Sequence, residues 1–252
     1  NDANGRAGTQ KHGLAEMENR AFLNRVTRVD FDDTGAPAPT FFDLEPLPPA
    51  QPKPGAALAT PYGIKISEDD STLVVTAAGS DKLITIDAQS GQVLGRVDVA
   101  AVPRGSALSS DKDGRPSQAW VLNAVENTVS LVDLSNTAKP SLVDRVVLED
   151  PTHPTIKRGR KAFETASAST TGTFACASCH PDGHTDQLLW VLNTPIVTGG
   201  DQIQPRITMP VRGLRDTEPY HWDGIPGDPY GGSNAANIDG HVAPNSDIND
   251  PT

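Results

Sequence analysis

The 252-residue sequence has only two cysteines, few aromatic residues and no long apolar run. Two cysteines three positions apart, at 176 and 179, exclude a disulfide framework. No apolar run approaches the roughly 20 residues that a membrane-spanning helix needs. Basic residues are also in the minority, 21 against 32 acidic ones, for a formal net charge of −11. A chain with this charge repels phosphate backbones, so we do not expect a nucleic-acid partner. Because the sequence has no long apolar run, we do not expect a membrane span either.

Residues 1–60 are predicted to hold one partial strand and a proline-rich linker. The segment 22–31 alternates weakly between apolar and polar residues, as a strand does. Prolines are frequent between residues 35 and 61. Because proline fixes φ and removes a backbone donor, we expect this stretch to be a linker or a long crossing loop outside any sheet.

Residues 61–150 have the pattern of short β-strands broken by Gly, Asp, Asn and Ser. Gly63 and Gly105 open two similar segments 42 residues apart. A four-strand unit of about 40–45 residues is the period of a propeller blade. The strands that follow each glycine are expected at 73–78, 82–87 and 92–99, and again at 120–124, 127–133 and 142–148.

These runs resemble the YVTN-type β-propeller family, whose blade has a Pro-x-Gly opening and strands that end in Val-Thr-Asn and in Asp. The matching residues are Pro61, Gly63, Val75, Thr76, Ile86, Asp87, Val132 and Asp133. The resemblance implies antiparallel, propeller-like blades, and an antiparallel sandwich is the alternative. Two blades do not close a propeller of about four to eight. We therefore expect missing segments or other chains to complete it.

The β pattern stops at Asp150, and residues 151–252 are expected to form a mostly α, loop-rich domain. A helix is predicted at 155–166, with Ile156, Gly159, Phe163 and Ala166 on one buried face. The glycine would allow a close helix crossing, and a second short helix is expected around 185–192. The predicted fold class is therefore multidomain, β followed by α.

Cys176, Cys179 and His180 form a C-x-x-C-H motif, in which each residue has a chemical role. The two thiols add to the vinyl groups of a porphyrin, and the adjacent histidine ligates the iron. A thioredoxin-like cysteine pair would follow a strand and begin a long helix. Structural zinc would need two further ligands, and His184 supplies at most one. The motif therefore predicts one covalently bound haem c.

The segments around the motif resemble the cytochrome c peroxidase and MauG-like group of c-type cytochromes. They are Arg-Gly-Arg-Lys-Ala-Phe at 158–163, Phe-Ala-Cys-Ala-Ser-Cys-His-Pro-Asp-Gly at 174–183, Met-Pro-Val-Arg-Gly-Leu at 209–214 and Pro-Tyr-His-Trp-Asp-Gly at 219–224. The resemblance implies a mostly helical cytochrome c domain. It also implies that Arg212 is a haem-propionate or structural partner, and that Tyr220 and Trp222 pack near the cofactor.

Several residues are candidates for the second axial ligand of the iron. Met209 is chemically suitable because a thioether raises the reduction potential. In the family, however, the ligand often follows the Trp-Asp-Gly turn, which favours His241. His184 and His221 are further candidates, and a ligand from outside these 252 residues is the remaining alternative.

The loop from Asp223 to Asp239 is a weak candidate for a Ca²⁺ site. Its carboxylates, which include Asp228, lie among glycines. They lack the alternation of an EF-hand, so a solvated, turn-rich loop is the favoured interpretation.

The sequence thus predicts a periplasmic or extracellular c-type cytochrome that transfers electrons to a redox partner protein, with the blades as scaffold. A peroxidase or MauG-like oxidase is the alternative. Family members of that kind use two haems, whereas this chain has one C-x-x-C-H motif. A propeller-based binding module or lactonase-like enzyme with a secondary haem is a third interpretation.

Overall fold

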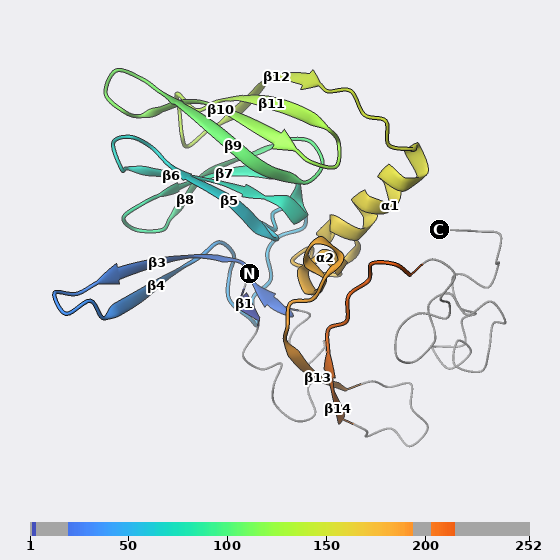
Figure 1. Ribbon diagram of the computed structural model, residues 1–252. Coiled ribbons are helices and arrows are strands. Elements are labelled where there is room, and N and C mark those ends of the chain that lie inside the picture. Colours follow the sequence, from blue (N-terminus) through green and yellow to red (C-terminus); the bar gives the residue numbers. More distant parts are fainter. Residues whose placement is uncertain (1, 4–19, 194–202, 215–252) are drawn as a thin grey trace. The chain divides into compact units, whose positions relative to one another are not determined.

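The computed structural model describes residues 2–3, 20–193 and 203–214 (Figure 1). The chain divides into two compact units after Cys179. The described residues of the first unit are 2–3 and 20–179, and those of the second are 180–193 and 203–214. The first unit therefore contains the cysteines of the C-x-x-C-H motif together with the two four-stranded sheets, whereas the histidine of the motif belongs to the second unit.

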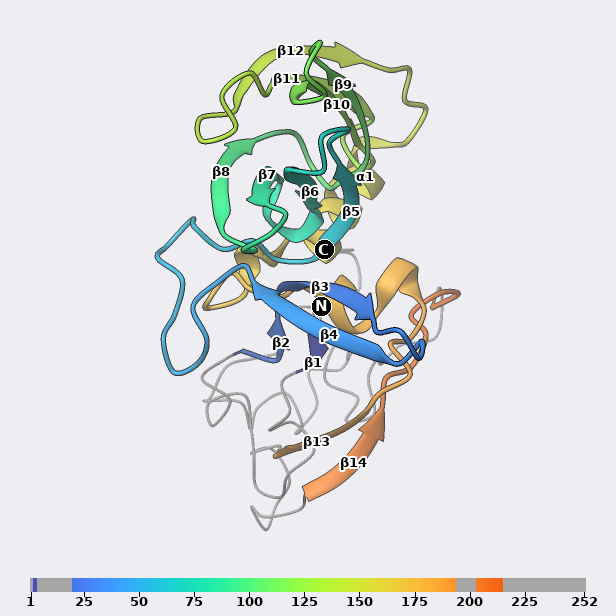
Figure 2. The same cartoon turned by 90° about the vertical axis from the view of Figure 1, so that its left-hand side faces the viewer.

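Two four-stranded antiparallel sheets dominate the first unit (Figures 1 and 2). In each of them every strand pairs with the next strand along the chain. The first sheet consists of β5 (Pro61–Ile66), β6 (Thr72–Ala77), β7 (Lys82–Asp87) and β8 (Val93–Asp98), and the second sheet of β9 (Pro103–Ser110), β10 (Pro116–Asn123), β11 (Thr128–Asp133) and β12 (Ser141–Val147). This antiparallel, up-and-down arrangement is consistent with propeller-like blades.

The central hairpins of the two sheets have the same loop. Four residues join β6 to β7, and four join β10 to β11. Each loop ends in a residue with positive φ, Asp81 at 54° and Asn127 at 58°. Asp and Asn tolerate this left-handed conformation because their short polar side chains bond locally. The repeat seen in the sequence is therefore also a repeat of backbone conformation.

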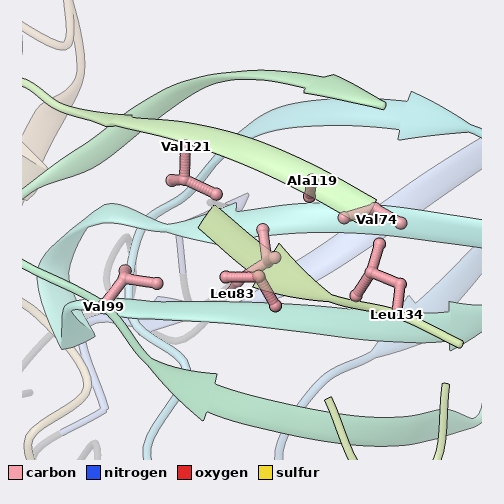
Figure 3. Packing of buried hydrophobic residues seen from close by; sticks show 7 residues of the cluster. Val74, Leu83, Val99, Ala119, Val121 and Leu134 are labelled. Atoms are coloured by element: carbon pink, nitrogen blue, oxygen red, sulfur yellow. The ribbon is translucent and has the colours of Figure 1, made fainter. Parts of the chain in front are cut away.

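One hydrophobic cluster joins the facing sides of the two sheets (Figure 3). Val74 and Leu83 come from the first sheet, and Ala119 and Val121 from the second, and all four are completely buried. The alternation of apolar residues along each strand directs them to one face, as the period of two requires. One core of the first unit therefore lies between the sheets, and a second buried cluster, with Leu44, Leu58, Val75 and Ile84, covers the other face of the first sheet.

Close packing between the sheets requires glycine at position 63. A Cβ atom there would lie 2.2 Å from the carbonyl oxygen of Arg104 on β9. The Thr76 hydroxyl accepts the Gly63 N–H at 2.8 Å and donates to Arg104 O at 3.1 Å. The approach of β9 to β5 thus explains the glycine that opens the first segment, whereas a Cβ atom on Gly105 would meet only Leu122 Cβ at 3.9 Å, an ordinary contact.

The proline-rich stretch is partly a strand, which corrects the prediction of a linker at 35–61. Strand β4 (Pro37–Asp43) pairs with β3 (Arg25–Phe31) along its whole length. Pro37 and Pro39 are two residues apart, so they direct their missing donors to the same edge. The outer edge of a two-stranded sheet has no partner strand, so a missing N–H donor costs no hydrogen bond there. The rule that excludes proline from central strands therefore does not apply.

Helix α1 (Pro154–Glu164) lies where a helix was predicted, but its predicted face is exposed at the start, half-buried at Phe163 and buried at Ala166, just beyond the helix. Ile156 is 59% exposed, and a Cβ atom on Gly159 would have nothing within 4 Å. The end of the helix is held by charge instead, because Arg104 of β9 lies 2.8 Å from the Glu164 carboxylate. Helical periodicity thus predicted the helix, and it predicted burial correctly at Ala166 but not at Ile156 or Gly159.

The short helix predicted at 185–192 is also wrong, because β13 (Leu189–Asn193) pairs there with β14 (Ile203–Ile207). Tryptophan and valine favour strands, and they outweighed the weak helical pattern. In the described part of 151–214 the α-helices are α1 and the four-residue α2, so a mostly helical domain is not shown. No helix among the described residues is long and apolar enough to cross a membrane. The remaining elements are β1 (Asp2–Ala3), β2 (Phe22–Leu23), α2 (Cys176–Cys179) and 3₁₀ turns at Ala78–Ser80, Ala166–Ala168 and Pro181–Gly183.

Asp150, just before α1, makes the stability of the first unit depend on acid pH. Hydrogen bonds from Thr152 and then from Lys157 hold the pKa of Asp150 at about 2, below its ordinary value of 3.8. A depressed pKa means that the ionised carboxylate stabilises the fold above about pH 4, and that this contribution is lost as the pH falls toward about 2. We expect Asp150→Asn to remove this part of the pH dependence in urea unfolding measured over that range.

Asn127→Ala is the matched control, because it removes a bond to Glu149 O without removing a titrating group. Its loss of stability should be the same at every pH. An Asp150→Asn protein with the full acid dependence of the unmodified chain would contradict the assignment.

Candidate functional site

The two cysteines lie on the outer side of one helical turn, α2, in the first unit. Ala177 and Ser178 between them are buried, whereas Cys176 is exposed and Cys179 is partly exposed. Residues three apart in a helical turn share a face, so both sulfurs are directed to the same side. No disulfide bond joins Cys176 to Cys179.

The buried residues of the turn fix it to the sheet-bearing unit. Ser178 Oγ accepts the N–H of Ala175 at 3.0 Å and lies 3.5 Å from the Thr60 hydroxyl, just before β5. Ala59, Ala166 and Ala175 form a small buried cluster beside it. Sequence reasoning missed Ser178 and Thr60. A hydroxyl three residues after Ala175 is a local signal for the first, but the contact to Thr60 spans 118 residues and has none.

A buried carboxylate fixes the loop that leads into the turn. Glu45 Oε2 accepts from Arg20 and from the Asn24 amide, both at 3.0 Å, and its Oε1 accepts the Leu58 N–H at 2.7 Å. The Asn24 amide also donates to Thr173 O at 2.9 Å. Arg20, Asn24 and Glu45 are at most 7% exposed. The position of residue 173 thus depends on a hydrogen-bonded group far away in the sequence.

His180 begins the second unit and has a defined tautomer. Its Nδ1 lies 2.8 Å from the carbonyl oxygen of Met209. A carbonyl oxygen can only accept, so Nδ1 carries the proton and the lone pair of the neutral ring is on Nε2. Metal-binding histidines commonly use their other ring nitrogen for such a bond. The ring is therefore in the form that can bind a metal through Nε2.

Residues 209–212 lie along the turn that follows His180. The Val211 N–H donates to Gly183 O at 2.9 Å, and Arg212 Nε donates to Asp182 O at 2.8 Å. Asp182 and Gly183 both have positive φ, 53° and 75°, which turns the chain at this point. These bonds and the one to His180 hold the two segments together.

Two further predicted residues, Met209 and Arg212, therefore lie along the turn that begins at His180. Arg212 donates from Nε to Asp182 O in that turn. Met209 contacts His180 through its backbone carbonyl, and its side chain is 54% exposed. His184, another candidate ligand, is exposed and ends the 3₁₀ turn with a backbone bond to Pro181 O.

Other predicted site residues lie outside the described residues. They are Tyr220, His221, Trp222, His241 and the carboxylates Asp223, Asp228 and Asp239. Within the described ranges, no group of three or more His, Cys, Asp or Glu is placed to hold a metal ion.

No protein-family model matches the sequence, and no curated protein matches it. Among solved structures, a similar one is hydrazine synthase from Kuenenia stuttgartiensis, with 29% identity over 36% of this chain and 24% of that chain, and a TM-score of 0.31. The periplasmic gluconolactonase of Pseudomonas aeruginosa has 22% identity over 51% of this chain and 35% of its own, with a TM-score of 0.38. Dihydro-heme d1 dehydrogenase NirN has 20% identity over 57% of this chain and 29% of its own, with a TM-score of 0.30. The chain thus spans about a quarter to a third of the length of these proteins.

Glu45→Ala tests the buried network. The substitution leaves the Arg20 charge buried without its carboxylate, so we expect the free energy of unfolding to fall by about 3–5 kcal/mol. Asp43→Ala is the control, because Asp43 pairs with Arg25 near the surface, where a pair contributes about 1 kcal/mol or less. Urea unfolding measures both, and equal losses would contradict the role given to Glu45.

Proposed function

We propose that the chain is an exported c-type cytochrome that transfers electrons through one haem c, bound by Cys176, Cys179 and His180. The observation that carries this proposal is a C-x-x-C-H motif whose two sulfurs share the outer side of one anchored turn. When bound, haem c supplies a reversible one-electron couple. The antiparallel sheets of the first unit are its scaffold.

The residues present fit a covalently held haem. The two thiols are spaced for the two vinyl groups, and Ala177 and Ser178 keep them on the outer side of the turn. The carbonyl of Met209 holds the proton of His180 on Nδ1, so Nε2 would be the nitrogen that binds the iron, and the bond would increase its basicity. Cys176 is exposed, so the porphyrin edge attached to it would be accessible to a redox partner protein.

Met209 is assigned here to the orientation of His180, and not to ligation through its sulfur. Its carbonyl bonds Nδ1, so its backbone lies on the opposite side of the imidazole from Nε2. The Met209 backbone would thus hold the imidazole, and a further iron ligand would come from another residue. Of the predicted ligands, His241 and His221 then have priority over Met209.

Replacement of both cysteines by alanine tests the attachment. In Cys176→Ala with Cys179→Ala we expect complete loss of covalently bound haem, because no thioether can form. Intact mass and extraction of haem from the denatured protein measure this. Ser169→Ala, in the same loop but outside the motif, is the control and should keep the haem. A covalently bound haem in the double variant would overturn the proposal.

Reactions of the holoprotein separate an electron carrier from a peroxidase. For a carrier we expect a low-spin, six-coordinate spectrum, reversible reduction and no reaction with peroxide or carbon monoxide. A high-spin iron that consumes peroxide would overturn electron transfer as the main activity and favour the peroxidase or MauG-like alternative.

Met209→Leu tests the role of the methionine. The substitution keeps the backbone carbonyl, so we expect the spectrum and the reduction potential of the holoprotein to stay nearly unchanged. His180→Ala, which removes the proposed iron ligand, is the contrasting variant and should change both. Loss of a sulfur-to-iron charge-transfer band in Met209→Leu, with a large fall in potential, would identify Met209 as the axial ligand.

A further inference from the structure

Helix α1 carries an excess of positive charge in a chain whose formal net charge is −11. Its 11 residues include four cations and one carboxylate, which are Lys157, Arg158, Arg160, Lys161 and Glu164. One cation and the carboxylate are compensated within the first unit. Lys157 lies 3.0 Å from a carboxylate oxygen of Asp150, and Glu164 lies 2.8 Å from Arg104.

The other three cations of the helix are exposed and form no ion pair with a described residue. They are Arg158, Arg160 and Lys161, and we call them the basic surface. Arg158 makes one hydrogen bond, at 3.3 Å to the Thr155 hydroxyl of the same helix, which leaves its charge uncompensated. The basic surface is therefore available to a negatively charged partner.

The stability of α1 does not explain these cations. Lys157 and Lys161 are four residues apart, and like charges at that spacing destabilise a helix. The first turn of α1 has no acidic residue, although the helix macrodipole favours one there. The charges of the basic surface thus favour an interaction outside the helix.

The basic surface lies at the end of the first unit that holds the cysteines. The Lys157 ammonium donates to Glu126 O at 2.8 Å, in the loop between β10 and β11, and Arg104 near the start of β9 pairs with Glu164. Helix α1 also lies beside α2 (Figure 1). Because Cys176 on α2 is exposed, the proposed haem edge and the basic surface share this end.

The loops at the opposite end of the two sheets are acidic. Antiparallel strands alternate in direction, so the loops after β5, β7, β9 and β11 lie at the end remote from α1 (Figure 1). Seven carboxylates and three cations lie in or next to these loops: Glu68, Asp69, Asp70, Asp87, Asp111, Asp113 and Asp133, with Lys112, Arg115 and Lys139. The net charge of the whole chain thus does not describe the surface beside the cysteines.

We infer that the basic surface is the docking site for an acidic surface of the redox partner protein, which rests on the proposed electron-transfer function. Salt limits the reach of each exposed charge to about 8 Å at physiological ionic strength, so the distant acidic loops do not cancel the attraction. Complementary charges raise the rate of encounter and set the orientation of the partner. The redox centre of the partner is thereby brought to the exposed side of the cysteine turn.

An anionic membrane surface is less suitable as the occupant. A helix that lies on a membrane inserts large apolar side chains between the lipids beside its cations. On α1 the exposed large apolar side chain is Ile156 alone. Charge complementarity with another protein needs no such insertion.

Binding of a fluorescent poly-L-glutamate peptide tests the surface whether or not haem is attached. In the triple variant Arg158→Gln, Arg160→Gln, Lys161→Gln we expect the affinity at low salt to fall about tenfold or more. Glutamine is a good helix former, so α1 should stay folded.

A second triple variant, Lys112→Gln, Arg115→Gln, Lys139→Gln, is the matched control. It removes the same charge from exposed positions at the opposite end, so we expect the affinity to change by less than about twofold. Equal losses in the two variants, or no binding by the unmodified chain, would overturn the inference. Binding to vesicles that contain phosphatidylserine, without binding to the peptide, would make a lipid surface the occupant.

Oxidation of the reduced holoprotein by hexacyanoferrate(III) relates the basic surface to the haem. The anion takes one electron and becomes hexacyanoferrate(II), and stopped-flow absorption follows the rate. For the unmodified protein we expect the rate to fall as salt is added, because salt screens the attraction to α1. The α1 variant should lose this fall and the control variant should keep it.

The two measurements separate the inference from the proposed function. A peptide that binds α1 in a protein without a reversible haem couple would contradict electron transfer and leave the docking site standing. A reversible couple whose oxidation rate is the same in the unmodified protein and the α1 variant would overturn the docking site alone. A rate that rises with salt in the unmodified protein would also overturn it, because the net charge would then govern the encounter.

Discussion

The buried carboxylate of Glu45 is the interaction on which the first unit depends. It accepts hydrogen bonds from Arg20, Asn24 and the backbone of Leu58. Through Asn24 the same group reaches Thr173, so one side chain relates the N-terminal strands, the segment before β5 and the loop that carries the cysteines. A buried charge is stable only when its hydrogen-bonding capacity is satisfied, so these segments are stable in one mutual arrangement.

The proposed haem ligands are prepared by two separate sets of contacts. The cysteine turn is fixed by small buried residues and by Ser178, within the unit that contains the sheets. The imidazole of His180 is fixed by the Met209 carbonyl, within the second unit. One set determines the direction of the sulfurs and the other determines the tautomer of the ring. Only their adjacency in the chain is common to both.

The two four-stranded sheets of the first unit have the same strand pairing, and they pack against each other. Gly63 and Thr76 bring β9 close to β5, and the cluster around Val121 fills the space between the sheets. The same backbone conformation then places Trp120 where the first sheet has Val74.

The sequence by itself determined the local features of this protein: strands with a period of two, hairpin loops with Asp or Asn in the left-handed region, the 42-residue repeat and the cysteine pair in one turn. These depend on residues close together in the chain, whose conformational preferences the sequence carries directly. Only the tertiary structure decided that Ile156 is exposed, that Pro37 lies in a strand, and that Met209 offers His180 its carbonyl. Each of these depends on which distant segment packs against, pairs with or bonds to the residue. The spacing of apolar residues along the chain does not specify such long-range contacts.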